Sequence, residues 1–423
     1  MTRLRSFGPL LMAALLIAAG CASSDPGGGN GGGGGGDNRD VPAQAVNDAL
    51  TALEEFLNAK LSPQMTVDWR FPLTLSRGVR QVWLTPSEVI VEDARRIING
   101  IDRTSGKSGF QFQLDFRNDA PDRVLAWPPA RTESLIHMIC SDGTFFTIDR
   151  FGNLEYNSIL DFEASGPPTG TDQFLLVGSQ TRFFYAWDAA NRRYEKRSRL
   201  AEIAKAAPVV HKNRVYIASN DGGVYSLSLE PRDFFDTVWE KKSFGEVASP
   251  LAVNGEANHL YVATQNSGVV NCYSLLNGEI EWSVSTECSI SADMLVDTSY
   301  SKDRMYVITE GSENQDINGL WCIRTVDPEK RDQGTKLWVF KGANKILALG
   351  KSHIYVRSGS PGAYKIALVR TADGTLEREF AVDPRFDLWL TNPHGPQIVL
   401  GSNWLHAESG GRVGLFFSVA EPQ

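Results

Sequence analysis

The chain has 423 residues, of which 42% are hydrophobic and 22% charged, a composition typical of globular proteins with a sizeable core. Its length allows two or three domains or one long all-β unit. The formal net charge of −8 at pH 7 repels phosphate backbones, so nucleic acid is not expected as a partner.

The first 20 residues are predicted to be a lipoprotein signal peptide. A basic start, "MTRLRS", precedes an apolar run, "PLLMAALLIAA", that is too short for a comfortable membrane span. The next residues, Ala18-Ala19-Gly20-Cys21, resemble the bacterial lipobox, although that pattern prefers Leu at the place of Ala18. The resemblance implies acylation of Cys21. Because Ala rather than Asp follows it, outer-membrane sorting is favoured. A plain secretory signal is the alternative.

Residues 21–40 are Gly-rich and are expected to form a flexible tether. An amphipathic helix is predicted over 41–62, because Val46, Leu50, Leu53 and Leu57 recur at helical spacing. Three roles are open for this helix: it packs on the following domain, it binds a partner in a groove, or it stiffens the tether.

From about residue 63 the hydrophobic period changes to two, and a strand–turn–strand unit such as "RVYIASNDGGVYSL" returns. Eight copies can be aligned on the position of Tyr216, with a mean spacing of about 44 residues. The aligned positions are Ile90, His137, Leu175, Tyr216, Tyr261, Tyr306, Tyr355 and Val399. A β-repeat of this period predicts that residues 63–423 form one all-β, eight-bladed β-propeller with four-stranded antiparallel blades.

Large aromatic residues close several repeats, as in "YSLLNGEIEW". This turn and its tryptophan resemble the blade signature of the pyrroloquinoline-quinone-like (PQQ-like) propeller family, in which the tryptophan docks between blades. The resemblance covers roughly residues 63–423 and implies structural docking roles for four residues: Trp69, Trp239, Trp282 and Trp338.

Size and anchoring resemble the propeller lipoproteins of the outer-membrane β-barrel assembly machinery. Two features depart from that subfamily: the Gly tract and the N-terminal helix. The segment "TVDWRF" (66–71), which contains Trp69, looks like an outer strand displaced to the N-terminus. Such a strand is expected to complete the last blade and remove the open sheet edge.

No catalytic, metal-binding or cofactor-binding residue is assigned. The quinone-dependent dehydrogenases share the propeller, but the adjacent cysteines typical of them are missing here, and no haem-attachment motif occurs. The cysteines Cys140, Cys272, Cys288 and Cys322 lie mostly in apolar runs and are expected to be buried, although an exported protein permits disulfides. Turn aspartates such as Asp221 and Asp373 are expected to cap their own backbone.

Two features are candidates for partner binding. One is a basic segment in an otherwise acidic chain, and it consists of Arg192, Arg193, Lys196, Arg197 and Arg199. A solvated outer strand is its alternative interpretation. The other candidate is a pair of long loops, 311–319 and 327–336, since variable loops on a rigid ring commonly bind.

The sequence therefore predicts a non-enzymatic, lipid-anchored, monomeric propeller without a cofactor. We expect it to bind an envelope protein complex, facing the periplasm at the outer membrane, in a role related to β-barrel protein assembly. The alternatives are a PQQ-like small-molecule binder or quinone-dependent oxidoreductase, and a binder of surface polysaccharide.

Overall fold

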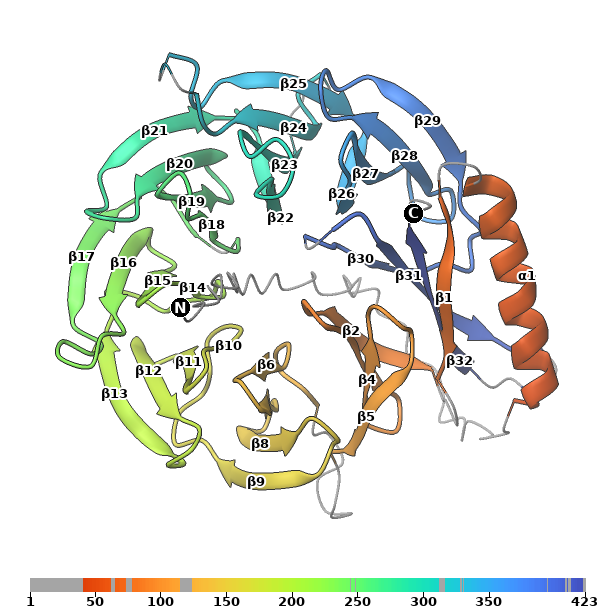
Figure 1. Ribbon diagram of the computed structural model, residues 1–423, viewed down its shortest axis with the longest axis horizontal. Helices are drawn as coiled ribbons and strands as arrows, with labels where there is room; N and C mark the ends of the chain where they lie inside the picture. Colours follow the sequence, from red (N-terminus) through yellow and green to blue (C-terminus); the bar gives the residue numbers. More distant parts are fainter. Residues whose placement is uncertain are drawn as a thin grey trace, which may run out of the picture.

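The computed structural model describes residues 41–420 except 62–64, 74–77, 115–123, 244, 248, 312–315, 328, 330, 394, 408, 410 and 411. The predicted signal peptide, the acylation site Cys21 and the predicted tether (21–40) lie outside the described residues. One helix, α1 (Ala43–Leu61), precedes 32 strands, and these form eight four-stranded antiparallel sheets arranged in a ring (Figure 1). The predicted eight-bladed β-propeller is confirmed.

The first four blades follow the chain in order, each from its innermost to its outermost strand. Blade 1 contains β2 (Val79–Leu84), β3 (Glu88–Asp93), β4 (Ile97–Asp102) and β5 (Ser108–Gln113). Blade 2 contains β6 (Ala130–Arg131), β7 (Leu135–Ile139), β8 (Thr144–Asp149) and β9 (Leu154–Ile159). Blade 3 contains β10 (Thr169–Gly170), β11 (Phe174–Gly178), β12 (Phe183–Asp188) and β13 (Arg193–Arg199). Blade 4 contains β14 (Val209–His211), β15 (Arg214–Ala218), β16 (Gly223–Ser228) and β17 (Thr237–Lys242).

The remaining blades continue the series, and the last one takes its outer strand from the start of the chain. Blade 5 contains β18 (Ala252–Asn254), β19 (His259–Thr264), β20 (Val269–Ser274) and β21 (Ile280–Ser285). Blade 6 contains β22 (Ser289–Val296), β23 (Arg304–Glu310), β24 (Gly319–Arg324) and β25 (Lys336–Lys341). Blade 7 contains β26 (Ala343–Leu349), β27 (His353–Ser358), β28 (Lys365–Arg370) and β29 (Leu376–Ala381). Blade 8 contains β30 (Leu388–Leu390), β31 (Ile398–Leu405), β32 (Arg412–Ala420) and β1 (Thr66–Pro72).

Because strands alternate in direction, the two faces of the ring carry different connections. We call the face with the links between blades, and with the turns between second and third strands, the link face. The opposite face carries the turns between first and second and between third and fourth strands, and we call it the turn face.

Strand β1 completes blade 8 by pairing antiparallel with β32, from Thr66 opposite Ala420 to Pro72 opposite Leu415 (Figure 1). The structure thus confirms that 66–71 belongs to an outer strand of the last blade. The ring is closed by hydrogen bonds between the two ends of the propeller, and the pairing covers a sheet edge that would otherwise be open.

One register position recurs in every blade. Tyr216 lies opposite Ser226, which lies opposite Trp239 just before a β-bulge in the outer strand. The same column runs through Tyr261, Cys272 and Trp282 and through Tyr306, Cys322 and Trp338. The predicted alignment is correct in seven blades and wrong by one residue in blade 3. There the equivalent residue is Leu176, because Leu176 pairs with Thr169 as Tyr216 pairs with Val209. In a run such as "FLLV", in which every residue is apolar, the period of two does not identify the face.

Each docking tryptophan packs against a glycine in the turn before the outer strand of the next blade. Trp69 lies over Gly106, Trp239 over Gly278, Trp282 over Gly334 and Trp338 over Gly374. An added Cβ would come within 2.6–2.9 Å of the indole in all four places, and all four glycines have positive φ. The repeated Gly-x-x-x-Trp spacing therefore contains both halves of the contact, the glycine that receives one tryptophan and the tryptophan that docks onto the next glycine.

Two of the four described cysteines, Cys272 and Cys322, lie in the middle of this row of paired residues, between the tyrosine and the tryptophan. In blades 5 and 6 the tyrosine and tryptophan rings approach to 5.8 and 5.9 Å across Cys272 and Cys322, so the middle residue has to be small. Blade 4 has Ser226 in this place, and blade 1 has Gly100. All four described cysteines are buried, which confirms the expected burial.

Helix α1 packs against blade 8, along β1 and β32 (Figure 1). Its apolar side, formed by Leu50, Leu53, Leu57 and Leu61, is buried in a cluster with Leu415 and Phe417 of β32 and with residues of blade 7. Of the three roles left open by the sequence, packing on the ring is the observed one. Within the described residues, no helix combines the length and the apolar character needed to cross a bilayer.

The C-terminal end of α1 lies where the other blades have the turn between their third and fourth strands. Blade 8 has no covalent turn between its third and fourth strands, since these are the two ends of the propeller. On blade 7, Arg378 lies in the outer strand at the position that a tryptophan occupies in blades 4 to 6, opposite Leu368. Its guanidinium donates to the carbonyl oxygen of Lys60 in the last turn of α1, at 2.9 Å. A cation at the C-terminus of a helix is favourable, so a charged contact replaces the aromatic one at this junction.

Candidate functional site

The predicted basic segment lies on the outer strand of blade 3 and in the turn before it. Four of its five cations contact neighbouring side chains. Arg192 lies over the Tyr156 ring at 5.2 Å, Arg197 lies over the Phe183 ring at 4.4 Å, and Arg193 pairs with Glu195. Arg199 is exposed at the end of β13. The strand is mostly exposed, as its alternative interpretation expects, and partner binding by these residues stays a prediction.

Lys196 holds the tryptophan position of blade 3. It lies opposite Ala186, next to the bulge, where other blades place Trp239 or Trp282. Its ammonium donates to the carbonyl oxygen of Phe234 and pairs with Asp236 at 2.7 Å, both in the corresponding turn of blade 4. Lys196 therefore joins two blades, a structural contact that the basic pattern of the sequence did not reveal.

Three side chains of types that can act in catalysis or metal binding make structural contacts instead: Asp221, Asp373 and His137. Asp221 accepts from the backbone of Gly223 in its own turn, and Asp373 does the same with Thr375, as expected of turn aspartates. His137 is fully buried between the hydroxyls of Thr132 and Thr147, and burial lowers its pKa to about 4. Among the described residues, no group of three or more His, Cys, Asp or Glu side chains is placed to hold a metal ion.

The predicted binding loops 311–319 and 327–336 are described only in part. Asp316 pairs with Lys341 at 2.6 Å, and Asp327 accepts from the backbone of Arg331 and Asp332. Residues 312–315, 328 and 330 lie outside the described part of the chain, so the role of these loops stays a prediction.

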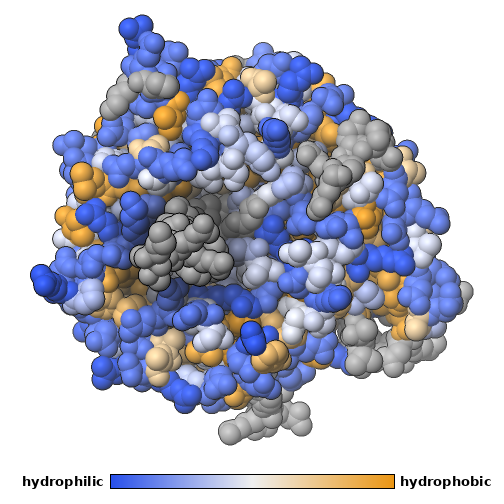
Figure 2. Space-filling model, in the orientation of Figure 1, coloured by the Kyte–Doolittle hydropathy of each residue, from blue (hydrophilic) through white to orange (hydrophobic). Residues whose placement is uncertain are grey.

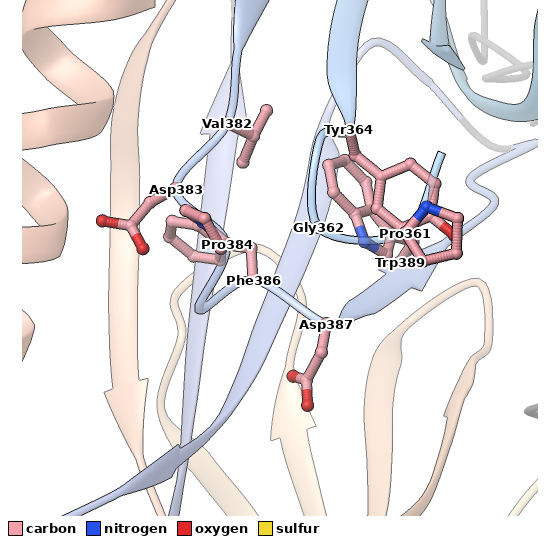
Figure 3. A pocket seen from close by; sticks show the side chains of 9 residues that line it. All are labelled: Pro361, Gly362, Tyr364, Val382, Asp383, Pro384, Phe386, Asp387 and Trp389. Atoms are coloured by element: carbon pink, nitrogen blue, oxygen red, sulfur yellow. The ribbon is translucent and has the colours of Figure 1, made fainter. Parts of the chain in front are cut away.

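A pocket of about 180 Å³ lies on the link face, at the junction of blades 7 and 8. Three segments build it: the turn between β27 and β28, the link from β29 to β30, and β30 itself. Figure 3 shows Tyr364, Pro361 and Trp389 on one side and Val382, Pro384 and Phe386 on the other. The lining also includes Gly362, Asp383 and Asp387.

Arg357 packs against both rings of the aromatic wall. Its guanidinium lies 4.3 Å from the centre of the Tyr364 ring and 5.7 Å from that of Trp389, and the two rings meet edge to face at 5.7 Å. It also donates to Asn344 at 2.7 Å. Burial lowers the pKa of Arg357 from its usual value, while Tyr364 and Asp293 oppose that change. The wall is thus held by cation–π and hydrogen-bond contacts before any ligand arrives.

An ionic network lies on the inner strands next to Arg357, which pairs with Lys345 in the β26–β27 ladder. Asp293, in a bulged part of β22, accepts from the backbone of Ile346 at 3.1 Å and from the hydroxyl of Thr391 at 3.3 Å. Lys345 approaches the same carboxylate to 3.9 Å. These contacts join blades 6, 7 and 8 beside the pocket, and they make this part of the ring a firm support for it.

Two groups in the pocket lining lack the protein contact that would satisfy or neutralise them: the indole N–H of Trp389 and the carboxylate of Asp387. Trp389 is 7% exposed, and its indole N–H has no acceptor among the described residues. Asp383 is paired with Arg385 at 2.7 Å, whereas Asp387 accepts a single backbone N–H from Asn403 and forms no ion pair with a described residue. An otherwise apolar pocket therefore has an unpaired donor buried in its wall and a negative charge at its rim.

The size of the pocket limits its ligands. Small-molecule and cofactor sites usually have volumes of about 300–1,000 Å³, while an apolar cavity of about 150 Å³ holds benzene. At about 180 Å³ this pocket fits one side chain or one small ring. Sequence reasoning missed it, because its residues come from two separate stretches, 361–364 and 382–389, and only the fold brings them together.

Figure 2 shows that the face in view is mostly hydrophilic, with hydrophobic residues in small separate groups. Exposed apolar patches that mark interfaces are usually larger and continuous. A partner that docked on this face would use individual side-chain contacts rather than one broad apolar surface.

No protein-family model matches the chain, and no curated protein matches it in sequence. Solved structures match in fold. BamB from Moraxella catarrhalis has a TM-score of 0.57 and 14% identity, over 83% of this chain and 97% of that one. The computationally designed protein Ika8 has a TM-score of 0.55 and 12% identity, over 81% and 96%. The quinohemoprotein alcohol dehydrogenase of Comamonas testosteroni has a TM-score of 0.57 and 10% identity, over 85% and 78%.

These likenesses support the eight-bladed fold. At such identities they do not carry function, since one propeller architecture serves unrelated tasks. Membership of the PQQ-like family stays a prediction.

Proposed function

We propose that this protein is a lipid-anchored scaffold that binds protein partners in the cell envelope, in the service of outer-membrane β-barrel assembly. Acylation of Cys21 would hold it on the periplasmic side of the outer membrane. The observation that carries the proposal is the pocket between blades 7 and 8, which has room for one side chain and is built on a firm support. Such pockets suit the anchor residues of a protein partner.

The likeness to BamB over nearly its whole length adds support from architecture. The position of α1 is also compatible with a tethered scaffold. It lies outside the ring, on β1 and β32 (Figure 1). The pocket lies on the link face, between blades 7 and 8. A tether that ends at α1 would leave the pocket accessible.

A pull-down of the native lipoprotein, gently solubilised from its own membranes, tests the proposal when it is combined with mass spectrometry. We expect recovery of an envelope protein that carries periplasmic domains and belongs to β-barrel assembly. A Cys21→Ser variant should fractionate with the soluble envelope and still bind its partner after purification. A native preparation that reproducibly lacks any protein partner would contradict the scaffold function.

A second candidate is a PQQ-like binder or quinone-dependent oxidoreductase, favoured by the likeness to the quinohemoprotein dehydrogenase. It predicts a quinone absorbance in the purified protein, or dehydrogenase activity after addition of PQQ and calcium. Either result would replace the scaffold proposal.

A further inference from the structure

We propose that the pocket between blades 7 and 8 binds an extended segment of the partner protein, with a proline or aliphatic side chain inside the pocket and a basic side chain against Asp387. This inference rests on the proposed function, because it names the part of the partner that the scaffold holds.

The shape of the pocket selects one apolar residue. Pro361, Pro384 and Tyr364 present rigid rings, and Val382 and Phe386 complete an apolar surface (Figure 3). A volume of about 180 Å³ accommodates a proline ring or a leucine side chain. Aromatic-lined grooves are a recurring solution for recognising extended, proline-containing peptides.

The indole of Trp389 supplies the polar half of the recognition. Its N–H is buried without an acceptor among the described residues, and leaving a buried donor unpaired is unfavourable by about 1–3 kcal/mol. A peptide in the extended conformation offers backbone carbonyl oxygens that are not used within the peptide. A carbonyl next to the inserted residue would accept from Trp389 and satisfy this donor.

The pocket is formed in advance of binding. Arg357 contacts the rings of both Tyr364 and Trp389, and Asp293 lies close enough to affect the Arg357 charge. A preformed wall reduces the side-chain entropy lost on binding. Even a short segment can therefore bind measurably.

The negative charge at the rim of the pocket selects which peptide residue lies beside the inserted apolar residue. Asp383 is neutralised by Arg385, but Asp387 is not neutralised by any described residue. With a net charge of −8, the whole protein also attracts basic segments. Lysine or arginine beside the inserted residue fits this rim, whereas glutamate would be repelled.

Titration of the ¹⁵N-labelled protein with short peptides tests the inference through the indole N–H resonances. The peptides carry Pro-Leu-Pro flanked by Lys, the same core flanked by Glu, and a Lys-flanked peptide with Ser in place of Leu. The chain has ten Trp, and the Trp389 resonance is assigned by its loss in Trp389→Phe. We expect the Lys peptide to move this resonance downfield and leave that of Trp404 in place.

The variants give the expected changes in affinity. Trp389→Phe keeps the ring and removes the donor, so affinity for the Lys peptide should fall about tenfold. Asp387→Asn keeps an acceptor for Asn403 and removes the charge, so the preference for Lys over Glu should shrink. Trp404→Phe, on β31 of blade 8, is the matched control. Thermal unfolding of each variant verifies that the ring remains intact.

Failure of the inference is distinguishable from failure of the scaffold function. An unmoved Trp389 resonance with all three peptides at millimolar concentration overturns the inference. So does equal recovery of the native partner by the wild type and by Trp389→Phe, although the scaffold function then stands. A wild-type protein that recovers no partner contradicts the scaffold function, and the peptide titration still decides on the pocket.

Discussion

Trp69 donates from its indole Nε1 to the carbonyl oxygen of Arg103, 2.7 Å away, and its ring covers Gly106. Trp69 belongs to β1 of blade 8, and Arg103 and Gly106 lie in the turn between β4 and β5 of blade 1. The junction between blade 8 and blade 1 is therefore fastened by the same contact that joins the blades inside the chain.

Trp69→Ala should lower the free energy of unfolding by about 3–5 kcal/mol, because it empties a buried aromatic site at the junction of blades 8 and 1. Trp69→Phe keeps much of the packing and loses mainly the hydrogen bond, so its effect should be about 1–2 kcal/mol. Equilibrium unfolding in urea measures both. Phe151→Ala, at a side chain that is 64% exposed, serves as the control. Equal effects at the two positions would contradict a fastening role for Trp69.

Gly278→Ala should destabilise the protein more than Gly362→Ala. Both residues have positive φ, +70° and +81°, so each alanine bears a similar backbone cost. At Gly278 the added Cβ would also lie 2.6 Å from the Trp239 ring, whereas at Gly362 it meets nothing within 4 Å. Overpacking should add about 1–3 kcal/mol at Gly278. Urea unfolding of the two variants gives this difference, and equal values would show that the blade junction relaxes freely.

Glu92 should make the protein less stable as pH rises from about 4.5 to about 7. Burial raises its pKa from 4.5 to about 7, against the backbone N–H of Leu125 and the charges of Arg80 and Arg96. Since the folded state holds the proton more tightly than the unfolded state, its advantage is complete below the lower value and declines through this window.

Glu92→Gln should remove this decline, because the amide stays neutral and can still accept from Leu125. Urea unfolding of both proteins at pH 5 and pH 8 measures the effect as a gain in stability of the variant at the higher pH. Glu155→Gln, on the exposed outer strand β9, controls for the change in net charge. A variant with the same pH dependence as the wild type would show that Glu92 does not titrate in this range.

Lys196→Met should lower stability by less than about 1 kcal/mol, because the lost ion pair with Asp236 is largely exposed. The loss should decrease at high salt. Arg199→Met, in the same strand, should leave stability unchanged. Calorimetry at low and high salt compares the two. If Lys196 instead served mainly to bind a partner, its substitution would weaken recovery of that partner without changing stability.

The repeat was predictable because its signals are local and recur. The Gly-x-x-x-Trp spacing and the alternation around Tyr216, Tyr261 and Tyr306 specify strand, face and turn within a few residues of one another. Leu176 shows the limit of that reasoning, since a run of apolar residues fits either face. Arg378 shows another limit: its place in the tryptophan column depends on α1, which is more than 300 residues away in the sequence.

The candidate site was not predictable for a related reason. Tyr364 and Trp389 lie in different blades, and the acceptor missing at Trp389 among the described residues is visible only when its surroundings are known. The basic segment around Lys196 was conspicuous in the sequence, yet β13 uses its charges to cover its own blade and to reach the next one. The sequence shows that charged residues are present, but only the strand pairing in the structure shows which residues they contact.

Closure of blade 8 also fixes the order in which the molecule can be completed. Strand β1 is made early, but its pairing partner extends from Arg412 to Ala420 and is made last. Contacts of such sequence separation form slowly. Until β32 arrives, the edge of β1 is unpaired and the part of the α1 leucine face that packs on β32 stays uncovered. An unpaired edge invites aggregation or proteolysis. A chain cut short before Arg412 would keep both exposed, so the seam of the ring also distinguishes finished molecules from unfinished ones.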